Sequence, residues 1–177
     1  MRIIAGKYRG KIIFPPLNFN ARPTTDFAKE SIFTMIHNTF NIENLTVLDL
    51  FSGTGSIAYE FCSRCCKELI AVEQDTLNAK YIKQQFEILN FNQATLIKEN
   101  AFKYLKNCKQ KFDIIFADPP YKLENINEIH DIVFKNDLLN PDSWLIIEHS
   151  DFIKLNNLPN FKIKKQYGSV NFSIFET

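Results

Sequence analysis

The 177-residue sequence lacks any apolar run close to the roughly 20 residues that a helix needs to cross a bilayer. It also lacks a secretory signal, because Met1 to Gly10 alternate charges with short apolar pairs. These absences predict a cytoplasmic protein with no membrane partner. No internal repeat, low-complexity tract or linker interrupts the chain, so we expect one domain, residues 1–177.

Metal ligands at regular spacings are missing as well. The chain has three histidines, which stand singly, and four cysteines, which are Cys62, Cys65, Cys66 and Cys108. The first three cysteines fall within one predicted helix, and no histidine stands at ligand-like spacing from them. We therefore interpret all four as small apolar core residues and expect no metal site.

The chain is 45% hydrophobic and 23% charged, which is typical of a folded globular protein. Its net charge of +1 conceals an uneven distribution, since the first 22 residues contain five cations and no acid. The five are Arg2, Lys7, Arg9, Lys11 and Arg22. This basic segment predicts a local phosphate-binding surface, with a solvated arm as the alternative.

Short apolar or β-branched runs alternate with helical patterns through most of the chain. Five runs predict strands at Thr46–Phe51, Leu69–Glu73, Ala94–Lys98, Phe112–Asp118 and Trp144–His149. In the helix expected after Asp75, the apolar positions near helical spacing are Leu77, Tyr81 and Ile88. Strands that alternate with helices predict βαβ units and a mostly parallel, doubly wound α/β sheet.

Both ends of the chain depart from this alternation. Residues 1–40 predict a hairpin, Arg2–Ala5 with Lys11–Phe14 about a turn at Gly6–Gly10, and then a helix from about Thr25 to Asn38. That helix carries an apolar stripe of Ala28, Ile32, Met35 and Ile36. Phe161–Phe175 predicts two strands joined at Gly168–Ser169, which should pair antiparallel because no crossover helix fits between them. We expect residues 41–177 to form a seven-stranded catalytic core and residues 1–40 to form an extension.

A glycine-rich turn, Asp49-Leu50-Phe51-Ser52-Gly53-Thr54-Gly55-Ser56, stands where the first predicted strand should pass into a helix. Ligands of open α/β sheets bind beyond the carboxyl ends of strands, beside the topological switch point. Gly53 and Gly55 would let the backbone turn tightly and let a ligand approach its amides. With Glu73 twenty residues after Gly53, the loop also fits a dinucleotide fingerprint, so a nicotinamide dehydrogenase is one alternative.

Asp49 indicates which class of ligand the glycine-rich loop binds. A carboxylate directed into the loop would repel a pyrophosphate but could pair with the ammonium group of a methionine moiety. S-adenosylmethionine has that ammonium, a ribose whose hydroxyls could donate to Glu73, and no phosphate. The pattern therefore favours S-adenosylmethionine as the cofactor.

The tetrapeptide Asp118-Pro119-Pro120-Tyr121 directly follows a predicted strand, which places it at the same edge as the glycine loop. An amine conjugated to a heterocycle is a poor nucleophile, and two fixed acceptors that hold its hydrogens can orient its lone pair. The Asp118 carboxylate and the Pro119 carbonyl could be these acceptors, because consecutive prolines lock the backbone. Tyr121 offers a ring on which a flipped base can stack. These four are the candidate catalytic residues.

Together these features resemble class I methyltransferases. The segments Arg2-Ile3-Ile4-Ala5-Gly6-Lys7-Tyr8-Arg9-Gly10 and Arg22-Pro23-Thr24-Thr25-Asp26 more closely resemble the opening of the RsmD family of small-subunit rRNA methyltransferases. The resemblance implies methylation of the N2 amine of guanine-966 in 16S rRNA, on an assembling small ribosomal subunit and by a monomer. It also implies that Arg2, Lys7, Arg9, Lys11 and Arg22 bind rRNA. The cofactor residues would be Thr24, Thr25, Asp49, Phe51, Gly53, Gly55, Glu73, Gln74, Asn100 and Ala101.

Asn100 departs from the pattern, because many class I enzymes have an aspartate there that accepts from the adenine amine. An amide oxygen can accept the same hydrogen bond, so Asn100 stays in the predicted site. Two other functions remain open. A DNA adenine-N6 methyltransferase would use the same tetrapeptide on a flipped base, and an assembly factor could bind rRNA without catalysis.

Overall fold

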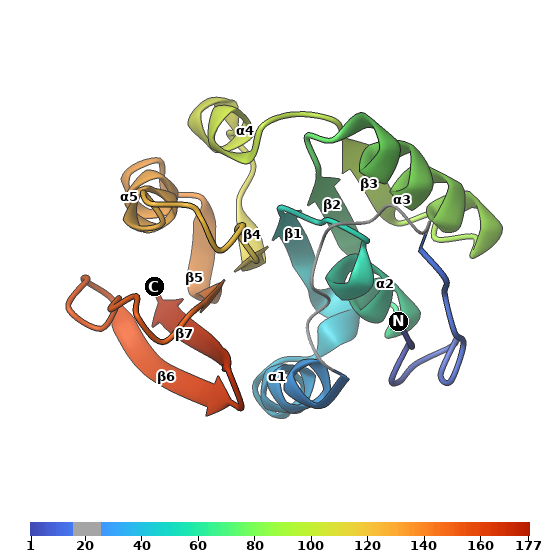
Figure 1. Ribbon diagram of the computed structural model, residues 1–177, viewed down its shortest axis with the longest axis horizontal. Helices are drawn as coiled ribbons and strands as arrows, with labels where there is room; N and C mark the ends of the chain where they lie inside the picture. Colours follow the sequence, from blue (N-terminus) through green and yellow to red (C-terminus); the bar gives the residue numbers. More distant parts are fainter. Residues whose placement is uncertain (16–25) are drawn as a thin grey trace.

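The computed structural model describes residues 1–15 and 26–177. Its centre is a seven-stranded sheet of order β3-β2-β1-β4-β5-β7-β6 (Figure 1). The strands are β1 (Thr46–Leu50), β2 (Glu68–Val72), β3 (Ala94–Ile97), β4 (Phe112–Ala117), β5 (Leu139–His149), β6 (Phe161–Tyr167) and β7 (Val170–Glu176). Pairing is parallel from β3 through to β5, whereas β7 is antiparallel to both β5 and β6. The predicted fold class and the antiparallel C-terminal hairpin are confirmed.

Helices cover both faces of the sheet (Figure 1). The helices are α1 (Asp26–Thr39), the 3-10 helix η1 (Ile42–Asn44), α2 (Ser56–Ser63), α3 (Thr76–Ile88), α4 (Ala101–Asn107) and α5 (Asn127–Lys135). Buried residues of α1, α2 and α3 form one apolar cluster with the sheet, and those of α4 and α5 form another. Successive strand residues alternate between the clusters, as Val47 and Leu48 do, so the central strands are apolar on both faces. Within the described ranges no helix is both long and apolar enough to cross a membrane.

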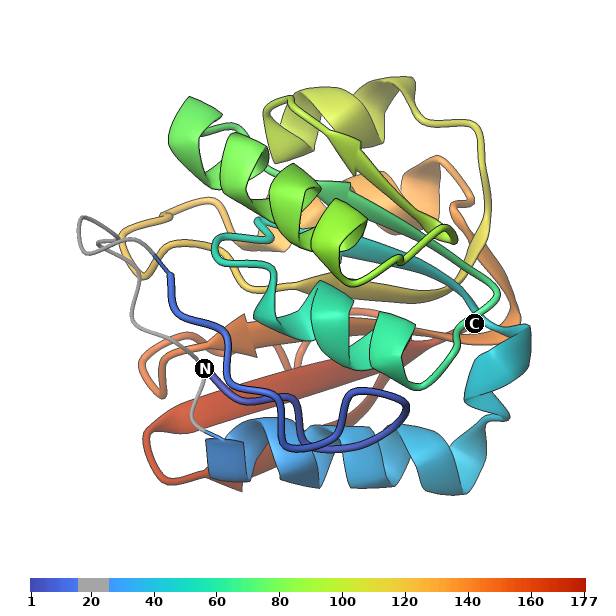
Figure 2. The same cartoon turned by 90° about the vertical axis from the view of Figure 1, so that its right-hand side faces the viewer.

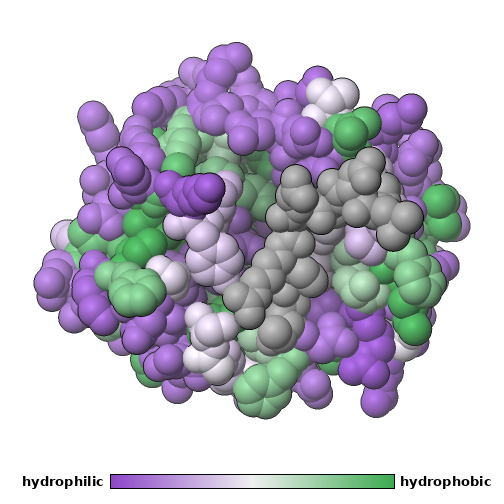
Figure 3. Space-filling view, viewed as in Figure 1, coloured by the Kyte–Doolittle hydropathy of each residue, from purple (hydrophilic) through white to green (hydrophobic). Residues whose placement is uncertain are grey.

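The predicted apolar face of α3 is wrong in two positions. Leu77 and Ile88 are 71% and 62% exposed, and the face packed on the sheet carries Ala79, Ile82 and Phe86 beside the correctly predicted Tyr81. The helix begins at its N-cap Asp75, whose carboxylate accepts from the amides of Leu77 and Asn78. In the view of Figure 3, exposed hydrophobic residues stand in separate groups among hydrophilic ones.

The stripe predicted for α1 is confirmed at Ala28, Ile32 and Ile36, which are fully buried, while Met35 is partly buried. The cysteine interpretation holds for Cys62, Cys66 and Cys108, which are buried and free. It is wrong for Cys65, which is exposed, because α2 ends at Ser63 and Cys65 follows in the turn with φ of 63°. The three clustered cysteines therefore do not share one helix.

The N-terminal hairpin forms but is too irregular to make two strands. One bridge joins Arg2 to Ile12, and main-chain bonds link Ile3 to Lys11 and Gly10. The hairpin is no free arm, because it lies along α2 (Figure 2). Arg22, Thr24 and Thr25 lie outside the described residues.

Glu60 of α2 is fully buried and anchors this hairpin. Its carboxylate accepts from the amides of Ile4 and Ala5 at 2.9 and 3.0 Å and pairs with Arg64 at 2.8 Å. Lys29 of α1, also buried, lies 3.9 Å from Glu60 and donates to the Arg2 carbonyl at 2.6 Å. Burial lowers the pKa of Lys29. This network of charges joins α1, α2 and the hairpin, and removing one partner would leave a buried charge uncompensated.

Candidate active site

The candidate site lies at the carboxyl ends of β1, β2, β4 and β5. The chain leaves β1 toward β2 on one side, and β4 lies on the other side, so β1 and β4 flank the switch point of the sheet. Leu50 is paired with Ala117 in register, and the amide of Asp118 donates to the Leu50 carbonyl at 3.4 Å. The structure thus brings the glycine loop and the tetrapeptide together, as their positions after strands predict.

The glycine loop turns sharply, with positive φ at Phe51 (58°), Gly53 (54°) and Gly55 (82°). A side chain on Gly53 would meet nothing nearer than the Phe51 carbonyl oxygen at 3.7 Å. A Cβ on Gly55 would lie 2.5 Å from the ring of Tyr59 in α2. Gly53 therefore leaves room for a ligand, whereas Gly55 is needed for packing, which the sequence analysis did not foresee.

Asp49 is buried beneath this loop, with 1% of its surface exposed. Its Oδ2 has no hydrogen-bond partner among the described residues. Burial raises the pKa of Asp49 to about 8, and the nearby Asp118 and Glu73 carboxylates add to the effect. An unpaired carboxylate oxygen in this position fits a cationic group, because pairing would compensate the desolvation.

Glu73 follows β2 and is held in place by backbone amides. One oxygen accepts from Gly53 at 2.7 Å and the other from Asp75 at 2.8 Å. Burial raises the pKa of Glu73 even though these two bonds oppose the shift. A carboxylate has about four acceptor positions, so acceptor capacity remains for a ligand that donates hydroxyls.

Asn100 has a local role that the sequence analysis missed. Its side-chain oxygen caps α4 by accepting from Phe102 and Lys103 at 3.1 and 3.2 Å, while its amide donates to Gln74 at 3.1 Å. An amide oxygen has two lone pairs, and both are used. The predicted bond to an adenine amine would have to replace one of them. Ala101 beside it is buried.

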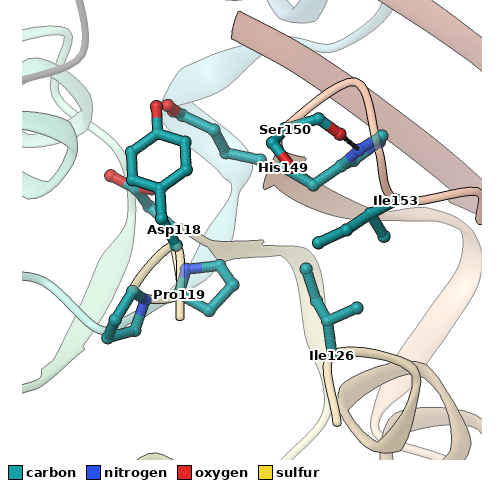
Figure 4. Close-up of a pocket in the computed structure, with 9 residues that line it drawn as sticks. Asp118, Pro119, Ile126, His149, Ser150 and Ile153 are labelled. Atoms are coloured by element: carbon teal, nitrogen blue, oxygen red, sulfur yellow. Dashed lines mark hydrogen bonds between the residues drawn. The ribbon is translucent and has the colours of Figure 1, made fainter. Parts of the chain in front are cut away.

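The tetrapeptide forms one wall of a pocket (Figure 4). Pro119 is buried, whereas Tyr121 is 52% exposed, which leaves part of its ring accessible. Burial raises the pKa of Asp118 to about 7. The pocket is lined by Asp118, Pro119, Pro120, Tyr121, Ile126, Glu148, His149, Ser150 and Ile153. The last five were not predicted as site residues. Glu148 could have been found, because it follows a buried apolar run and ligands bind beyond the carboxyl ends of strands.

The basic side chains of the hairpin lie away from this edge. Lys7, Arg9 and Lys11 are exposed, whereas Arg2 lies 3.4 Å from Asp26. The turn of the hairpin contacts Ser63, the last residue of α2, whereas the glycine loop precedes the first residue of that helix. An eight-residue helix is about 12 Å long, so Lys7, whose amide donates to the Ser63 carbonyl, is separated from the glycine loop by roughly that distance. Within the described ranges, no group of three or more histidine, cysteine, aspartate or glutamate side chains could hold a metal ion.

Known proteins resemble this chain over nearly its whole length. A family model described as "Conserved hypothetical protein 95" matches residues 1–176. Ribosomal RNA small subunit methyltransferase D from Buchnera aphidicola subsp. Baizongia pistaciae is 30% identical over 180 residues, which cover 99% of this chain and 91% of that protein. The protein of that name from Escherichia coli K12 is 25% identical over 179 residues, covering 99% and 89%.

Solved structures share the fold of this chain. The structure of yhhF from Escherichia coli has a TM-score of 0.85 and 25% identity, with 99% of this chain and 96% of that chain covered. A hypothetical protein from Thermus thermophilus shares the fold at a TM-score of 0.86 and 21% identity, covering 100% and 99%. Because the family model spans nearly every residue and the relatives align from end to end, the chain belongs to the RsmD family of class I methyltransferases.

Proposed function

We propose that this chain transfers a methyl group from S-adenosylmethionine to the N2 amine of a guanine in small-subunit rRNA, at guanine-966 of 16S rRNA. One observation carries the proposal: the partly buried Asp118 carboxyl lies at the end of β4, one strand from the unpaired Asp49 oxygen at the end of β1. A site for an amine thus adjoins a site for a cation. The names of the relatives support ribosomal RNA as the substrate.

The residues present fit the cofactor. Asp49 would hold its ammonium group, and Glu73, already oriented by Gly53 and Asp75, would accept from its ribose hydroxyls. Gly53 leaves the loop open for close approach. When bound, S-adenosylmethionine supplies an electrophilic methyl group on a positively charged sulfur.

The tetrapeptide would orient the acceptor amine. The Asp118 carboxylate and the Pro119 carbonyl accept its two hydrogens, which turns the nitrogen lone pair out of the base plane and toward the methyl group. The new bond joins nitrogen and carbon, while the electron pair of the broken carbon–sulfur bond stays on sulfur. The nitrogen then loses one proton, which Asp118 is placed to accept because its pKa is raised to about 7. Tyr121 offers a partly exposed ring against which the base can stack.

The exposed cations Lys7, Arg9 and Lys11 would hold rRNA phosphates beyond the pocket. Their separation from the glycine loop means that the bound RNA must extend along α2. This predicts an RNA footprint of several nucleotides, larger than the target base alone.

The test incubates the protein with methyl-labelled S-adenosylmethionine and small subunits that lack this modification, and maps the labelled nucleoside by mass spectrometry. We expect N2-methylguanosine at one rRNA site, and no label with Asp118→Ala. Calorimetric titration of Asp118→Ala with S-adenosylmethionine is the control, because this variant should still bind the cofactor. Label in DNA adenine would instead support the adenine-N6 function, and cofactor binding without transfer to any substrate would support an assembly factor.

A further inference from the structure

The acceptor pocket contains a second carboxylate, Glu148, at the end of β5. β4 and β5 are parallel neighbours whose register pairs Ala117 with Ile147, so Asp118 and Glu148 stand at equivalent positions, one residue further along. Ala117 and Ile147 both face the cluster formed with α4 and α5. Because side chains alternate along a strand, Asp118 and Glu148 both leave toward the opposite face, on neighbouring strands about 4.8 Å apart.

Glu148 is almost fully buried, with 4% of its surface exposed, and it lines the pocket together with the tetrapeptide. A carboxylate buried to this extent is costly unless donors satisfy it. A carboxylate also has about four acceptor positions, so contacts within the protein are compatible with a further bond to a substrate.

His149, the next residue, contributes no positive charge to the pocket. One ring nitrogen bonds to the Ser150 carbonyl at 2.8 Å (Figure 4). The other bonds to the Ser173 hydroxyl, also at 2.8 Å, and burial lowers the pKa of His149. The other lining side chains are aliphatic or proline, apart from Ser150 and the partly exposed Tyr121. The pocket therefore offers carboxylate acceptors and apolar walls, and within residues 1–15 and 26–177 no lysine or arginine lines it.

This set of groups matches one nucleobase edge. Guanine presents the N1 hydrogen beside the two hydrogens of its N2 amine, so these two adjacent groups both donate, while O6 beyond N1 accepts. In adenine and cytosine, the amine stands beside a ring nitrogen that accepts, and this nitrogen would face a carboxylate unfavourably. Two adjacent carboxylates thus suit guanine, one at the amine and one at N1.

We infer that Glu148 is a specificity-determining residue that accepts the N1 hydrogen of the target guanine while Asp118 holds its N2 amine. This inference rests on the proposed function and names the group that selects the base. A site built to accept a hydrogen discriminates against an analogue that lacks it, because a buried acceptor is then left without its donor.

The test uses an RNA substrate in which the target guanine is replaced by 2-aminopurine. This base keeps the amine on the same ring carbon, but its N1 is an acceptor without a hydrogen. For the wild-type protein, kcat/KM for guanine should exceed that for 2-aminopurine by about 10- to 100-fold. In Glu148→Gln, the side-chain amide can turn and donate to N1 of 2-aminopurine, so the ratio should fall at least about tenfold. Glu124→Gln, at an exposed position after the tetrapeptide, removes the same charge and should keep the wild-type ratio.

Equal kcat/KM values of the wild-type protein for the two bases would overturn the inference, whatever the variant does. An unchanged ratio in Glu148→Gln would overturn it as well, and in both cases methylation of the guanine amine would leave the proposed function standing. If neither base accepts a methyl group although S-adenosylmethionine binds, the proposed function fails and the inference fails with it. A purely structural role for Glu148 would lower both rates together and leave the ratio unchanged.

Discussion

Replacing Asp49 with asparagine should change how the stability of the protein depends on pH. An aspartate in an unfolded chain has a pKa of about 3.9, whereas burial raises the pKa of Asp49 to about 8 in the folded protein. The folded state therefore holds this proton more tightly than the unfolded state does. The contribution of Asp49 favours folding below about pH 4 and is lost as the pH rises to about 8.

The size of the effect follows from the interval between the two pKa values. Between pH 5 and pH 7 the carboxyl is ionised in the unfolded chain and protonated in the folded chain, so each pH unit lowers the free energy of unfolding by about 1.4 kcal/mol. Over two units the loss is about 3 kcal/mol, a large part of the 5–15 kcal/mol that is typical of domains. Asp49→Asn has no proton at this position, so its free energy of unfolding should decrease by about 3 kcal/mol less over that range.

Urea titrations at pH 5, 6 and 7, followed by the fluorescence of the buried Trp144, measure this difference. Asp118, whose pKa is also raised, is present in both proteins, so most of its own contribution cancels, and its interaction with Asp49 is part of the measured difference. Glu43→Gln, at an exposed position in η1, serves as the control and should follow the wild type. If the wild type and Asp49→Asn lose stability equally between pH 5 and pH 7, the reasoning about the buried, unpaired carboxyl is refuted.

Asp49→Asn should also weaken S-adenosylmethionine binding by about 10- to 100-fold, because the ammonium group of the cofactor loses a charged partner. Calorimetry would measure this loss, and an unchanged affinity would contradict the assignment of Asp49 to the ammonium group. The methylation rate of the wild type should rise about tenfold from pH 6 to pH 8, since the ionised Asp118 is the acceptor and its pKa is about 7; a flat pH–rate profile would exclude that role. Gly6→Ala should detach the hairpin, because its Cβ would lie 2.0 Å from a carbonyl oxygen of α2. Gly10→Ala is the control, since it adds only the cost of a positive φ, about 1 kcal/mol. Equal rates of limited proteolysis in the hairpins of the two variants would refute this. Replacing Lys7 and Lys11 with glutamine should make the slope of log K against log salt for rRNA binding shallower by about 1.5, and an unchanged slope would remove them from the RNA surface.

Much of the fold was predictable because strands carry their own signal. Apolar runs such as Phe112–Ala117 located the strands to within a few residues, and the short Gly168–Ser169 connection required the C-terminal strands to be antiparallel. The rule that ligands bind at strand ends located the glycine loop and the tetrapeptide at one edge. β5 was the exception, since it begins at Leu139, five residues before the predicted Trp144, with a register shift opposite β4.

Other features depended on contacts between distant residues. Glu60 has no local sequence signal of burial, yet it receives two amides of the hairpin from 55 and 56 residues away. The apolar residue Leu77 was assigned to the core by its spacing, but α3 packs on the sheet through Ile82 and Phe86, which leaves Leu77 exposed to solvent.

The sequence by itself determined the alternation of strands and helices, the residues at the strand ends, and the family to which the chain belongs. Only the tertiary structure decided that one Asp49 oxygen has no partner in the described part of the chain, that Asn100 caps α4, and that Glu148 shares a pocket with Asp118. The physical reason is the distance along the chain over which the deciding interactions act. Helix and strand periodicity depends on residues a few positions apart, whereas burial and hydrogen bonding depend on which side chains the packed sheet and helices bring together.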